Sequence, residues 1–253
     1  MKAVAVTGLG KAFRKNGASR PVLQDVSLGV EAGRFVSLIG PSGCGKSTLL
    51  KVIAGLVDHD AGEVRLGAER VTGPRRDIGV MFQNPVLLPW RTVLDNVALP
   101  GELSGEAAAD REARAAGLLR LVGLAGYERY YPRELSGGMR QRAALARVLM
   151  REPALLLLDE PFGALDEFTR ETLDFALMEI VAATGQTVIL VTHNIGEAIL
   201  MSDEIAVMAA EPGRIVGSVR PGFPRPRTLA LLRRPEYADR VFEVRTLLGL
   251  GAA

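Results

Sequence analysis

The sequence is poor in cysteine, in net charge and in long apolar runs, and each absence excludes a class of protein. Its one cysteine, Cys44, has no partner in the chain for a disulfide bond, which fits a reducing compartment. Lys and Arg number 31 and Asp and Glu 29, a formal net charge of +2. Nothing in that balance demands nucleic acid or an anionic membrane as a partner.

Apolar runs such as Ala154–Leu158 and Thr187–Val191 are far shorter than the roughly 20 residues that span a bilayer. The first residues, Met1–Val4, lack the apolar core and cleavage pattern of a signal peptide. We therefore expect a soluble cytoplasmic protein whose membrane association would come through a partner. What is present is ordinary for globular proteins: 253 residues, 48% of them hydrophobic and 24% charged, enough for one domain or two small ones.

Apolar runs of strand length recur along the chain and alternate with helical patterns. They lie at Gly33–Ile39, Asp77–Phe82, Ala154–Leu158, Thr187–Val191 and Glu204–Met208. This alternation predicts an α/β fold, with a parallel sheet covered by helices on both faces. One of the helices is expected to be capped by Asp166 and to end at Gly185.

Three other segments depart from that alternation. The first 35 residues and Gly62–Val71 resemble short strands with glycine turns, which predicts an antiparallel β subdomain. Thr92–Asp95 is a capping-box pattern and Glu106–Leu124 is rich in Ala, Leu and Arg, which predicts a helical insertion. The expected organisation is a single domain with its core in 1–91 and 153–219, a helical subdomain in 92–152 and a tail with short amphipathic helices in 220–253.

A complete phosphate-binding loop follows the first buried strand and opens a helix. The residues matching G-x-x-x-x-G-K-[ST] are Gly40, Pro41, Ser42, Gly43, Cys44, Gly45, Lys46, Ser47 and Thr48. Backbone N–H groups of such a loop cradle phosphate, Lys46 would reach the β- and γ-phosphate oxygens, and Ser47 would ligate Mg²⁺. Cys44 fits a small filler residue better than a redox switch, although a thiol near a helix N-terminus can have a lowered pKa.

A second strand end carries two carboxylates. Four leucines, Leu155–Leu158, can bury a central strand, and Asp159 and Glu160 follow at its carboxyl end, where open α/β sheets bind ligands. Beside a phosphate-binding loop, Asp159 is expected to hold Mg²⁺ and Glu160 to act as general base toward the attacking water.

A second phosphate cradle lies far downstream of the first. In Leu135–Arg142, Ser136, Gly137 and Gly138 precede a helical run predicted over Gln141–Leu149. A helix N-terminus offers N–H donors and a positive dipole end, and glycines allow a phosphate oxygen to approach the backbone. One nucleotide does not need two such cradles, so nucleotide is expected to bind between two copies of the chain.

Taken in order, these motifs resemble those of the nucleotide-binding subunit of ATP-binding cassette (ABC) transporters, over roughly residues 3 to 220. The elements that carry the resemblance are the phosphate-binding loop, Gln83, Leu135–Gln141, Asp159-Glu160, Gly163-Ala164-Leu165-Asp166 and His193. The resemblance implies a P-loop ATPase core, ATP and Mg²⁺ as ligands, and a head-to-tail dimer that encloses two ATP molecules.

The same resemblance assigns roles that the residues alone do not. Gln83 would contact Mg²⁺ or the attacking water and sense the membrane partner, and His193 would hydrogen-bond the γ-phosphate. Asp166 would link the two copies. Phe13 would stack on adenine, although an apolar residue at this place could instead belong to the core. Met139 stands where the family usually has Gln, and we expect this departure to be tolerated.

Two further stretches narrow the resemblance to importers of nitrate, aliphatic sulfonates, taurine and thiamine precursors. They are Met81–Val93, with Pro89-Trp90, and Glu211–Ile215 together with Pro224–Arg227. Trp90 either presents an apolar contact for a partner helix or packs within its subdomain, and Arg225 and Arg227 are interpreted as a solvated tail.

The implied partners are transmembrane permease subunits, a second copy of the chain and, through the permease, a periplasmic or extracellular solute-binding protein, but no nucleic acid. The implied location is peripheral, on the cytoplasmic face of the inner membrane. The alternatives left open are an exporter or lipid-extraction ATPase, and a non-transport cassette ATPase acting on nucleic acid. The transported solute is not readable from this chain.

Overall fold

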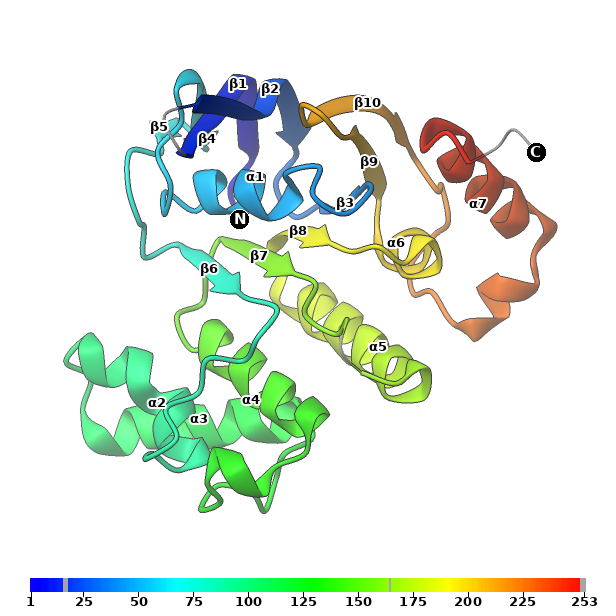
Figure 1. Cartoon of the computed structure of the whole chain (residues 1–253). Coiled ribbons are helices and arrows are strands. Elements are labelled where there is room, and N and C mark those ends of the chain that lie inside the picture. The colour runs from blue at the N-terminus through cyan, green and yellow to red at the C-terminus, as the bar shows by residue number, and fades with distance from the viewer. Residues whose placement is uncertain (16–17, 164, 251–253) are drawn as a thin grey trace. The chain divides into compact units, whose positions relative to one another are not determined.

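The computed structural model describes residues 1–15, 18–163 and 165–250 (Figure 1). Its contacts divide the chain into two units, Met1–Arg75 with Gly185–Ala253, and Arg76–Thr184. The predicted helical subdomain, 92–152, lies within the second unit. In the described part of the chain, no helix combines the length and the apolar character needed to cross a membrane.

The first unit holds two sheets and four helices in its described residues. Its strands are β1 (Val4–Lys15), β2 (Ala18–Val30), β3 (Phe35–Ile39), β4 (Ala61–Leu66), β5 (Glu69–Arg70), β8 (Thr187–Val191), β9 (Glu204–Ala209) and β10 (Arg214–Val219). Its helices are α1 (Lys46–Ile53), α6 (Ile195–Met201), the 3₁₀ helix η2 (Leu229–Arg233) and α7 (Pro235–Leu247). The predicted α/β fold, with a P-loop core and an antiparallel β subdomain, is confirmed.

Strand β3 lies between β8 and β9 and runs parallel to both. Every residue of β3 and β8 is buried, as continuous apolar runs predict for central parallel strands. The sheet is not entirely parallel, because β10 pairs antiparallel with β9. Sequence reasoning missed β10 because its residues form no continuous apolar run: the first five alternate between exposed and half-buried positions, and only Val219 is buried.

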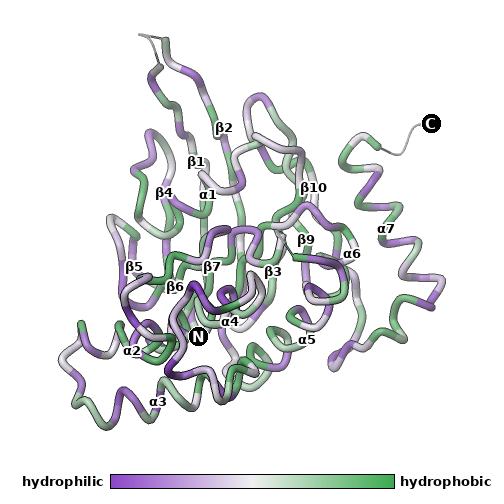
Figure 2. The backbone as a smooth tube through the Cα atoms, turned by 60° about the horizontal axis from the view of Figure 1, so that its bottom comes forward, coloured by the Kyte–Doolittle hydropathy of each residue, from purple (hydrophilic) through white to green (hydrophobic). Residues whose placement is uncertain are grey.

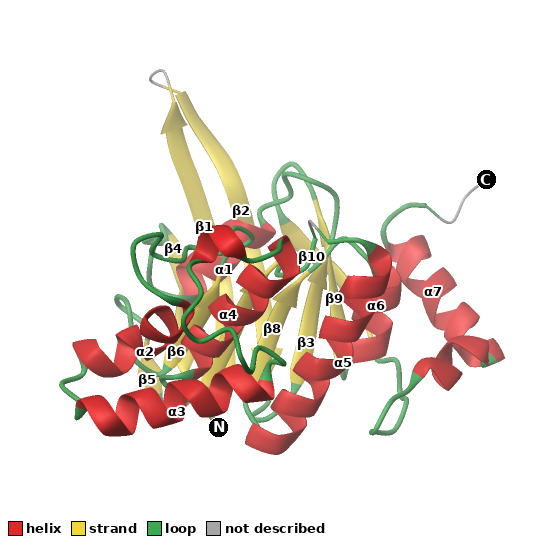
Figure 3. Cartoon of the chain, turned by 90° about the horizontal axis from the view of Figure 1, so that it is seen from below, coloured by secondary structure: helices red, strands yellow, loops and turns green. Residues whose placement is uncertain are grey.

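The antiparallel sheet has the order β2-β1-β4-β5. Its first two strands are 12 and 13 residues long, not short as predicted. Figure 3 shows one end of this two-stranded ribbon extending beyond the rest of its sheet. Residue pairs near that end include Phe13 with Arg20, so Phe13 lies toward the tip of the ribbon.

The second unit combines two parallel strands with four α-helices and one 3₁₀ helix in its described residues. They are β6 (Ile78–Met81), α2 (Val93–Leu103), α3 (Ala108–Leu121), η1 (Pro132–Glu134), α4 (Gly137–Leu149), β7 (Leu155–Asp159) and α5 (Glu167–Thr184). Strand β6 pairs with β7 in parallel, with Met81 opposite Leu158. Helix α4 approaches β6 so closely that a Cβ on Gly79 would lie 2.6 Å from Val148 Cγ1.

Helices α2, α3 and α4 pack against one another, as Figure 1 shows. Along α3, hydrophilic and hydrophobic residues alternate in the manner of an amphipathic helix (Figure 2). The predicted capping box at the start of α2 is present: the Asp95 N–H donates to Thr92 Oγ1 and the Thr92 N–H donates to Asp95 Oδ2. The helical subdomain of the predicted fold is therefore present.

Candidate functional site

The phosphate-binding loop continues directly from the buried strand β3 and ends at helix α1. Gly45 is the N-cap of α1, with φ +98°, and the helix has no side-chain cap. A Cβ on Gly40 would lie 2.5 Å from the carbonyl oxygen of Met208, and one on Gly45 would lie 2.7 Å from Leu23 Cδ2. The glycines at both ends are therefore required by the surrounding backbone and side chains as well as by the loop's conformation.

Lys46 lies within this loop, with only 6% of its surface exposed. Its ammonium group donates to the carbonyl oxygens of Gly40 at 2.7 Å and Pro41 at 3.0 Å, and lies 3.7 Å from Cys44 Sγ. Cys44 is itself buried, which favours its interpretation as a packed filler residue. The loop thus gathers a buried cation, glycine backbone and the exposed Ser47 at one helix N-terminus, which is the chemistry that a nucleotide's phosphates require.

Phe13 lies in β1, which pairs with β2, and β2 contacts the phosphate-binding loop. Gly45 packs on Val22 and Leu23 of β2, and Leu23 is the register partner of Lys11 in β1. The Lys11 ammonium stands 5.4 Å from the centre of the Phe13 ring. Phe13 is 44% exposed, so the interpretation of Phe13 as a core residue is wrong.

His193 is exposed in the short loop between β8 and α6. The residues on both sides of it are tied to the first turn of α6. Asn194 is the N-cap and accepts a hydrogen bond from the Glu197 N–H at 3.1 Å. Thr192 Oγ1 donates to the Glu197 carboxylate and accepts from the Asn194 N–H at 2.9 Å. The position of the imidazole therefore depends on the position of α6.

In the second unit, Gln83 and Glu160 meet at the carboxyl ends of β6 and β7. Gln83 Nε2 donates to Glu160 Oε2 at 3.3 Å. Two parallel neighbours place the residues that follow them at the same edge, so the strand pairing explains the contact. Glu160 has φ +45°, a left-handed conformation that is strained for a residue with a side chain and is frequent at functional sites.

Asp159, half-buried at the end of β7, precedes Glu160. Among the described residues, no cluster of three or more His, Cys, Asp or Glu side chains could hold a metal ion. Mg²⁺ at phosphoryl-transfer sites needs no such cluster, because one or two carboxylates and the substrate's phosphates hold it. The oxygen donors of Ser47, Gln83 and Asp159 are of the type that Mg²⁺ prefers.

The second cradle is the N-terminus of α4. This helix begins at Gly137, four residues before the predicted start, because Ser136 caps it: the Met139 N–H donates to Ser136 Oγ at 3.3 Å. Gly137 is exposed, with Leu165 Cδ2 3.8 Å away from its ideal Cβ position. Ser136 and Gly137 therefore lie on the surface of the unit, open to a ligand.

Asp166 is the predicted cap of the helix that follows. It accepts a hydrogen bond from the Thr169 N–H at 2.9 Å, and this bond holds the pKa of Asp166 below its ordinary value. Leu165 and Thr169 pack on Gly138, so the start of α5 adjoins the second cradle. Gly163 precedes this turn, and Ala164 of the same motif lies outside the described residues.

The segment between β6 and α2 presents Trp90 with 71% of its surface exposed, so the interpretation that it packs within its subdomain is wrong. The segment is fixed on both sides. The buried Asn96 side chain accepts from the Leu88 N–H at 2.7 Å and donates to the Leu88 carbonyl at 3.0 Å. Arg91 forms a bidentate ion pair with Glu102 at 2.6 and 3.1 Å. The sequence did not single out Asn96, whose role follows only from its burial in α2.

Residues 23–163 match the family model described as ABC transporter. The chain is 45% identical to an aliphatic sulfonates import ATP-binding protein of Bacillus cereus, over 89% of this chain and 88% of the relative. It is 46% identical to a taurine import ATP-binding protein of Escherichia coli O157:H7, over 81% of each.

Solved structures resemble it as well. A dimeric ATP-binding cassette in a post-hydrolysis state, bound to ADP and Pi, has a TM-score of 0.79 and 32% identity, covering 87% of this chain and all of that one.

Proposed function

This chain belongs to the ABC transporter family and is an ATPase, and we propose that it energises the import of an aliphatic sulfonate, taurine, nitrate or a related small solute. The observation that carries the proposal is its 45–46% identity, over more than four fifths of each chain, to import ATP-binding proteins for sulfonates and taurine. The solute itself would be bound by other subunits.

ATP hydrolysis in this proposal divides the chemistry among the predicted residues. Mg²⁺, when bound with ATP, neutralises charge on the phosphates, and Ser47, Asp159 and Gln83 would hold it. Lys46 binds the β- and γ-phosphate oxygens. Glu160 accepts a proton from the attacking water, and the 3.3 Å contact from Gln83 orients its carboxylate. His193 donates a hydrogen bond to the γ-phosphate, and Phe13 stacks on adenine.

We further propose a head-to-tail dimer in which Ser136, Gly137 and Gly138 of one copy bind the ATP held by the other copy's phosphate-binding loop. Exposure of Ser136 and Gly137 at a helix N-terminus supports this assignment. Asp166 adjoins the same surface and would contact the partner copy. The similarity to a cassette solved as a dimer with ADP and Pi supports it too.

The proposed membrane partner is a permease, contacted through the segment that carries Trp90. An exposed aromatic side chain on a segment pinned by Asn96 and the Arg91–Glu102 ion pair suits an interface, because little conformational entropy is lost on binding. In this proposal the chain lies peripherally on the cytoplasmic face of the membrane, and a solute-binding protein acts through the permease.

Glu160→Gln tests the catalytic assignment. It should leave ATP binding intact, lower turnover by about 10²-fold or more, and trap an ATP-bound dimer detectable by size-exclusion chromatography. Glu152→Gln is a matched control, because Glu152 also has positive φ, +48°, but is exposed in the loop between α4 and β7. Turnover of Glu160→Gln equal to that of the control would remove Glu160 from its role.

The import assignment is tested with the purified chain reconstituted with its permease and solute-binding protein. Taurine, an alkanesulfonate or nitrate should stimulate ATP hydrolysis, and one of them should do so at the lowest concentration. Absence of stimulation by all three would overturn the substrate class while leaving the ATPase assignment untouched.

A further inference from the structure

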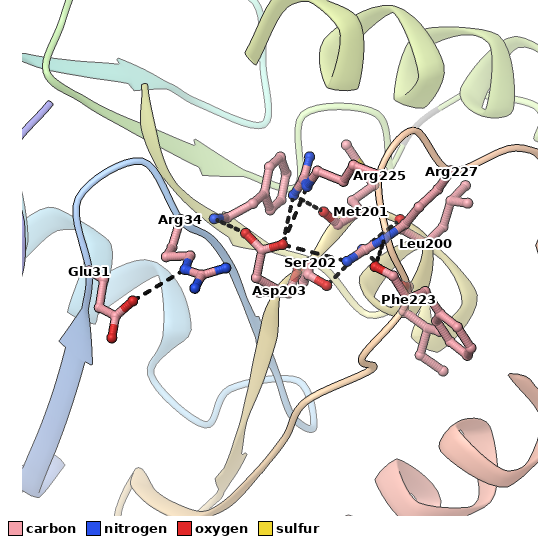
Figure 4. A network of polar contacts seen from close by, with 12 residues as sticks. Glu31, Arg34, Leu200, Met201, Ser202, Asp203, Phe223, Arg225 and Arg227 are labelled. Atoms are coloured by element: carbon pink, nitrogen blue, oxygen red, sulfur yellow. Dashed lines mark hydrogen bonds and ion pairs between the residues drawn. The ribbon is translucent and has the colours of Figure 1, made fainter. Parts of the chain in front are cut away.

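Arg227 of the Pro224–Arg227 motif is buried against helix α6, although both arginines of the motif were interpreted from the sequence as a solvated tail, and Pro224, Arg225 and Pro226 are exposed. Only 3% of the Arg227 side chain is exposed. Its Nη1 donates to the carbonyl oxygens of Leu200 at 2.9 Å and Ser202 at 2.7 Å, and its Nε donates to that of Phe223 at 3.1 Å (Figure 4). The solvated-tail interpretation is therefore wrong for Arg227.

The carbonyls of Leu200 and Ser202 belong to the C-terminal end of α6, where the helix leaves its last acceptors without intrahelical partners. Arg225 satisfies another of them, since its Nη2 donates to the Met201 carbonyl at 2.9 Å. A guanidinium at this end also interacts favourably with the helix dipole. The two arginines of the motif thus cap α6 from outside its own sequence.

Asp203 fastens this cap to the sheet. Its Oδ1 accepts from Arg225 Nη2 at 3.2 Å and from Arg227 Nη2 at 3.5 Å, while its Oδ2 accepts from the Phe35 N–H at 3.0 Å (Figure 4). Phe35 is the first residue of β3, the strand that leads into the phosphate-binding loop. The carboxylate therefore joins the tail, the end of α6 and the strand behind the nucleotide site.

Helix α6 has only seven residues, so few hydrogen bonds are internal to it and its position depends on its two ends. The C-terminal end is capped by Arg225 and Arg227. The N-terminal end follows His193 directly and is tied to it through Thr192, Asn194 and Glu197. A displacement at one end is therefore transmitted to the other over less than two turns of helix.

We propose that Arg227, oriented by Asp203, is a positioning residue for ATP hydrolysis that holds α6 so that His193 meets the γ-phosphate. The inference rests on the role proposed for His193. Burial, the largest effect, lowers the pKa of Arg227 to about 10, so the guanidinium is still protonated at neutral pH. A buried cation stays protonated only with good partners, and here the partners are helix carbonyls and one carboxylate.

Arg227→Met removes the hydrogen bonds and keeps the length of the side chain. We expect its kcat for ATP to fall about tenfold with an apparent affinity for ATP within about twofold of the parent, because the phosphate-binding loop is unchanged and only the reacting geometry is displaced. Arg227→Lys, which keeps the charge, should recover part of the loss. If Arg227→Met does not fold, Asp203→Asn tests the same cap.

A matched control separates positioning from stability. Val244 is buried in the apolar cluster between α6 and α7, so Val244→Ala weakens docking of the tail without touching the cap. At a temperature well below both unfolding midpoints, Val244→Ala should keep its kcat even where its midpoint falls as far as that of Arg227→Met. The proposal would be overturned if Val244→Ala and Arg227→Met lowered the unfolding midpoint equally and also lowered kcat equally.

A double-mutant cycle then asks whether Arg227 acts through His193. His193→Ala should slow turnover, and adding Arg227→Met should cause little further loss. If the two losses multiply, the positioning role is wrong while the role of His193 stands. If His193→Ala turns over at the parent rate, the role of His193 fails, and the inference fails with it.

Discussion

The two glycine-containing helix starts of this chain differ in how they are surrounded. At the start of α1, the neighbouring backbone closes around the loop, because a Cβ on Gly40 would lie 2.5 Å from the Met208 carbonyl oxygen. At the start of α4, a Cβ on Gly137 would have its nearest neighbour at 3.8 Å. The first cradle is shaped by its own unit, whereas the second is open at Ser136 and Gly137 and closed only at Gly138, on which Thr169 and Leu165 pack.

The N-termini of α1 and α4 also differ in whether a side chain accepts hydrogen bonds from their first backbone N–H groups. Helix α1 has no side-chain cap, so no hydroxyl competes with a phosphate for its first N–H groups. Helix α4 is capped by Ser136, and the cap uses the Met139 N–H. The first cradle has the form of a complete phosphate site and the second the form of a surface that completes another site, which agrees with the proposed head-to-tail dimer.

The largest effect on turnover is expected when the phosphate-binding loop loses the ammonium group of Lys46. Lys46→Met removes the ammonium that now donates to Gly40 and Pro41, and with it the positive charge for the β- and γ-phosphates. Turnover should fall by about 10²-fold or more, as when one preorganised donor is removed from other active sites. Steady-state ATPase assays measure this, and Lys51→Met, an exposed lysine of the same helix, is the control.

Mixing two inactive variants tests whether the cradles act in the same copy or across two copies. Gly137→Asp should inactivate the second cradle, since a carboxylate there repels phosphate, and an acidic residue at a helix N-terminus does not harm folding. In a mixed head-to-tail dimer of Lys46→Met and Gly137→Asp, one of the two sites has both cradles intact.

The mixture should therefore hydrolyse ATP well above either variant alone. A mixture no more active than its components would place both cradles in one copy or exclude the second from hydrolysis. The baseline is an equal mixture of the Lys46→Met variant with a double variant that carries both Lys46→Met and Gly137→Asp. None of the dimers in this mixture contains an intact site.

Alanine substitutions at Gly40 and at Gly137 should change the free energy of unfolding in opposite directions. Gly40→Ala places a methyl group against backbone and should lower the free energy of unfolding by about 1–3 kcal/mol. Gly137→Ala meets no close neighbour and replaces a poor helix former, so it should raise the free energy by up to about 1 kcal/mol. Urea unfolding measures both changes.

Gly137→Ala should nevertheless weaken ATP-dependent dimerisation in the Glu160→Gln background, because its methyl group occupies the space through which phosphate approaches the backbone. Stability and dimerisation would then move in opposite directions. A variant that is more stable and dimerises normally would show that the second cradle does not bind phosphate closely.

The sequence predicted most where the chemistry is local. The phosphate-binding loop, the Asp159-Glu160 strand end and the capping box at Thr92 each depend on residues a few positions apart, and their positions on strand, loop and helix are confirmed. Helix α4 begins four residues before its predicted start, because the Ser136 cap compensates for the low helix propensity of Gly137 and Gly138.

What the sequence did not predict depends on distant backbone. Arg227 contacts the carbonyls of Leu200 and Ser202, 27 and 25 residues before it. Every residue type has a backbone carbonyl, so the residue types at these positions do not indicate the contact. The positive φ of Glu160 and the burial of Asn96 are likewise set by neighbouring elements. The proline-arginine pattern of the tail was visible in the sequence, but the burial of Arg227 depends on the position of α6.

The smallest effect is expected within the second cradle, at the one residue that departs from the usual family pattern. Met139 takes part in the Ser136 cap through its backbone N–H, and its side chain is only half-buried. Met and Gln have similar length and helix propensity, so Met139→Gln should change the free energy of unfolding by less than about 0.5 kcal/mol. Turnover should stay within about twofold of the parent, because the cap and glycine N–H groups are unchanged.

Ser136→Ala is the informative comparison for Met139→Gln, since it removes the hydroxyl cap itself and should cost about 1 kcal/mol of stability. Urea unfolding and ATPase assays on both variants decide the point. If Met139→Gln alters turnover as much as Ser136→Ala does, the side chain at 139 belongs to the cradle. The open surface at the start of α4 would then be defined by side chains as well as by its backbone and Ser136.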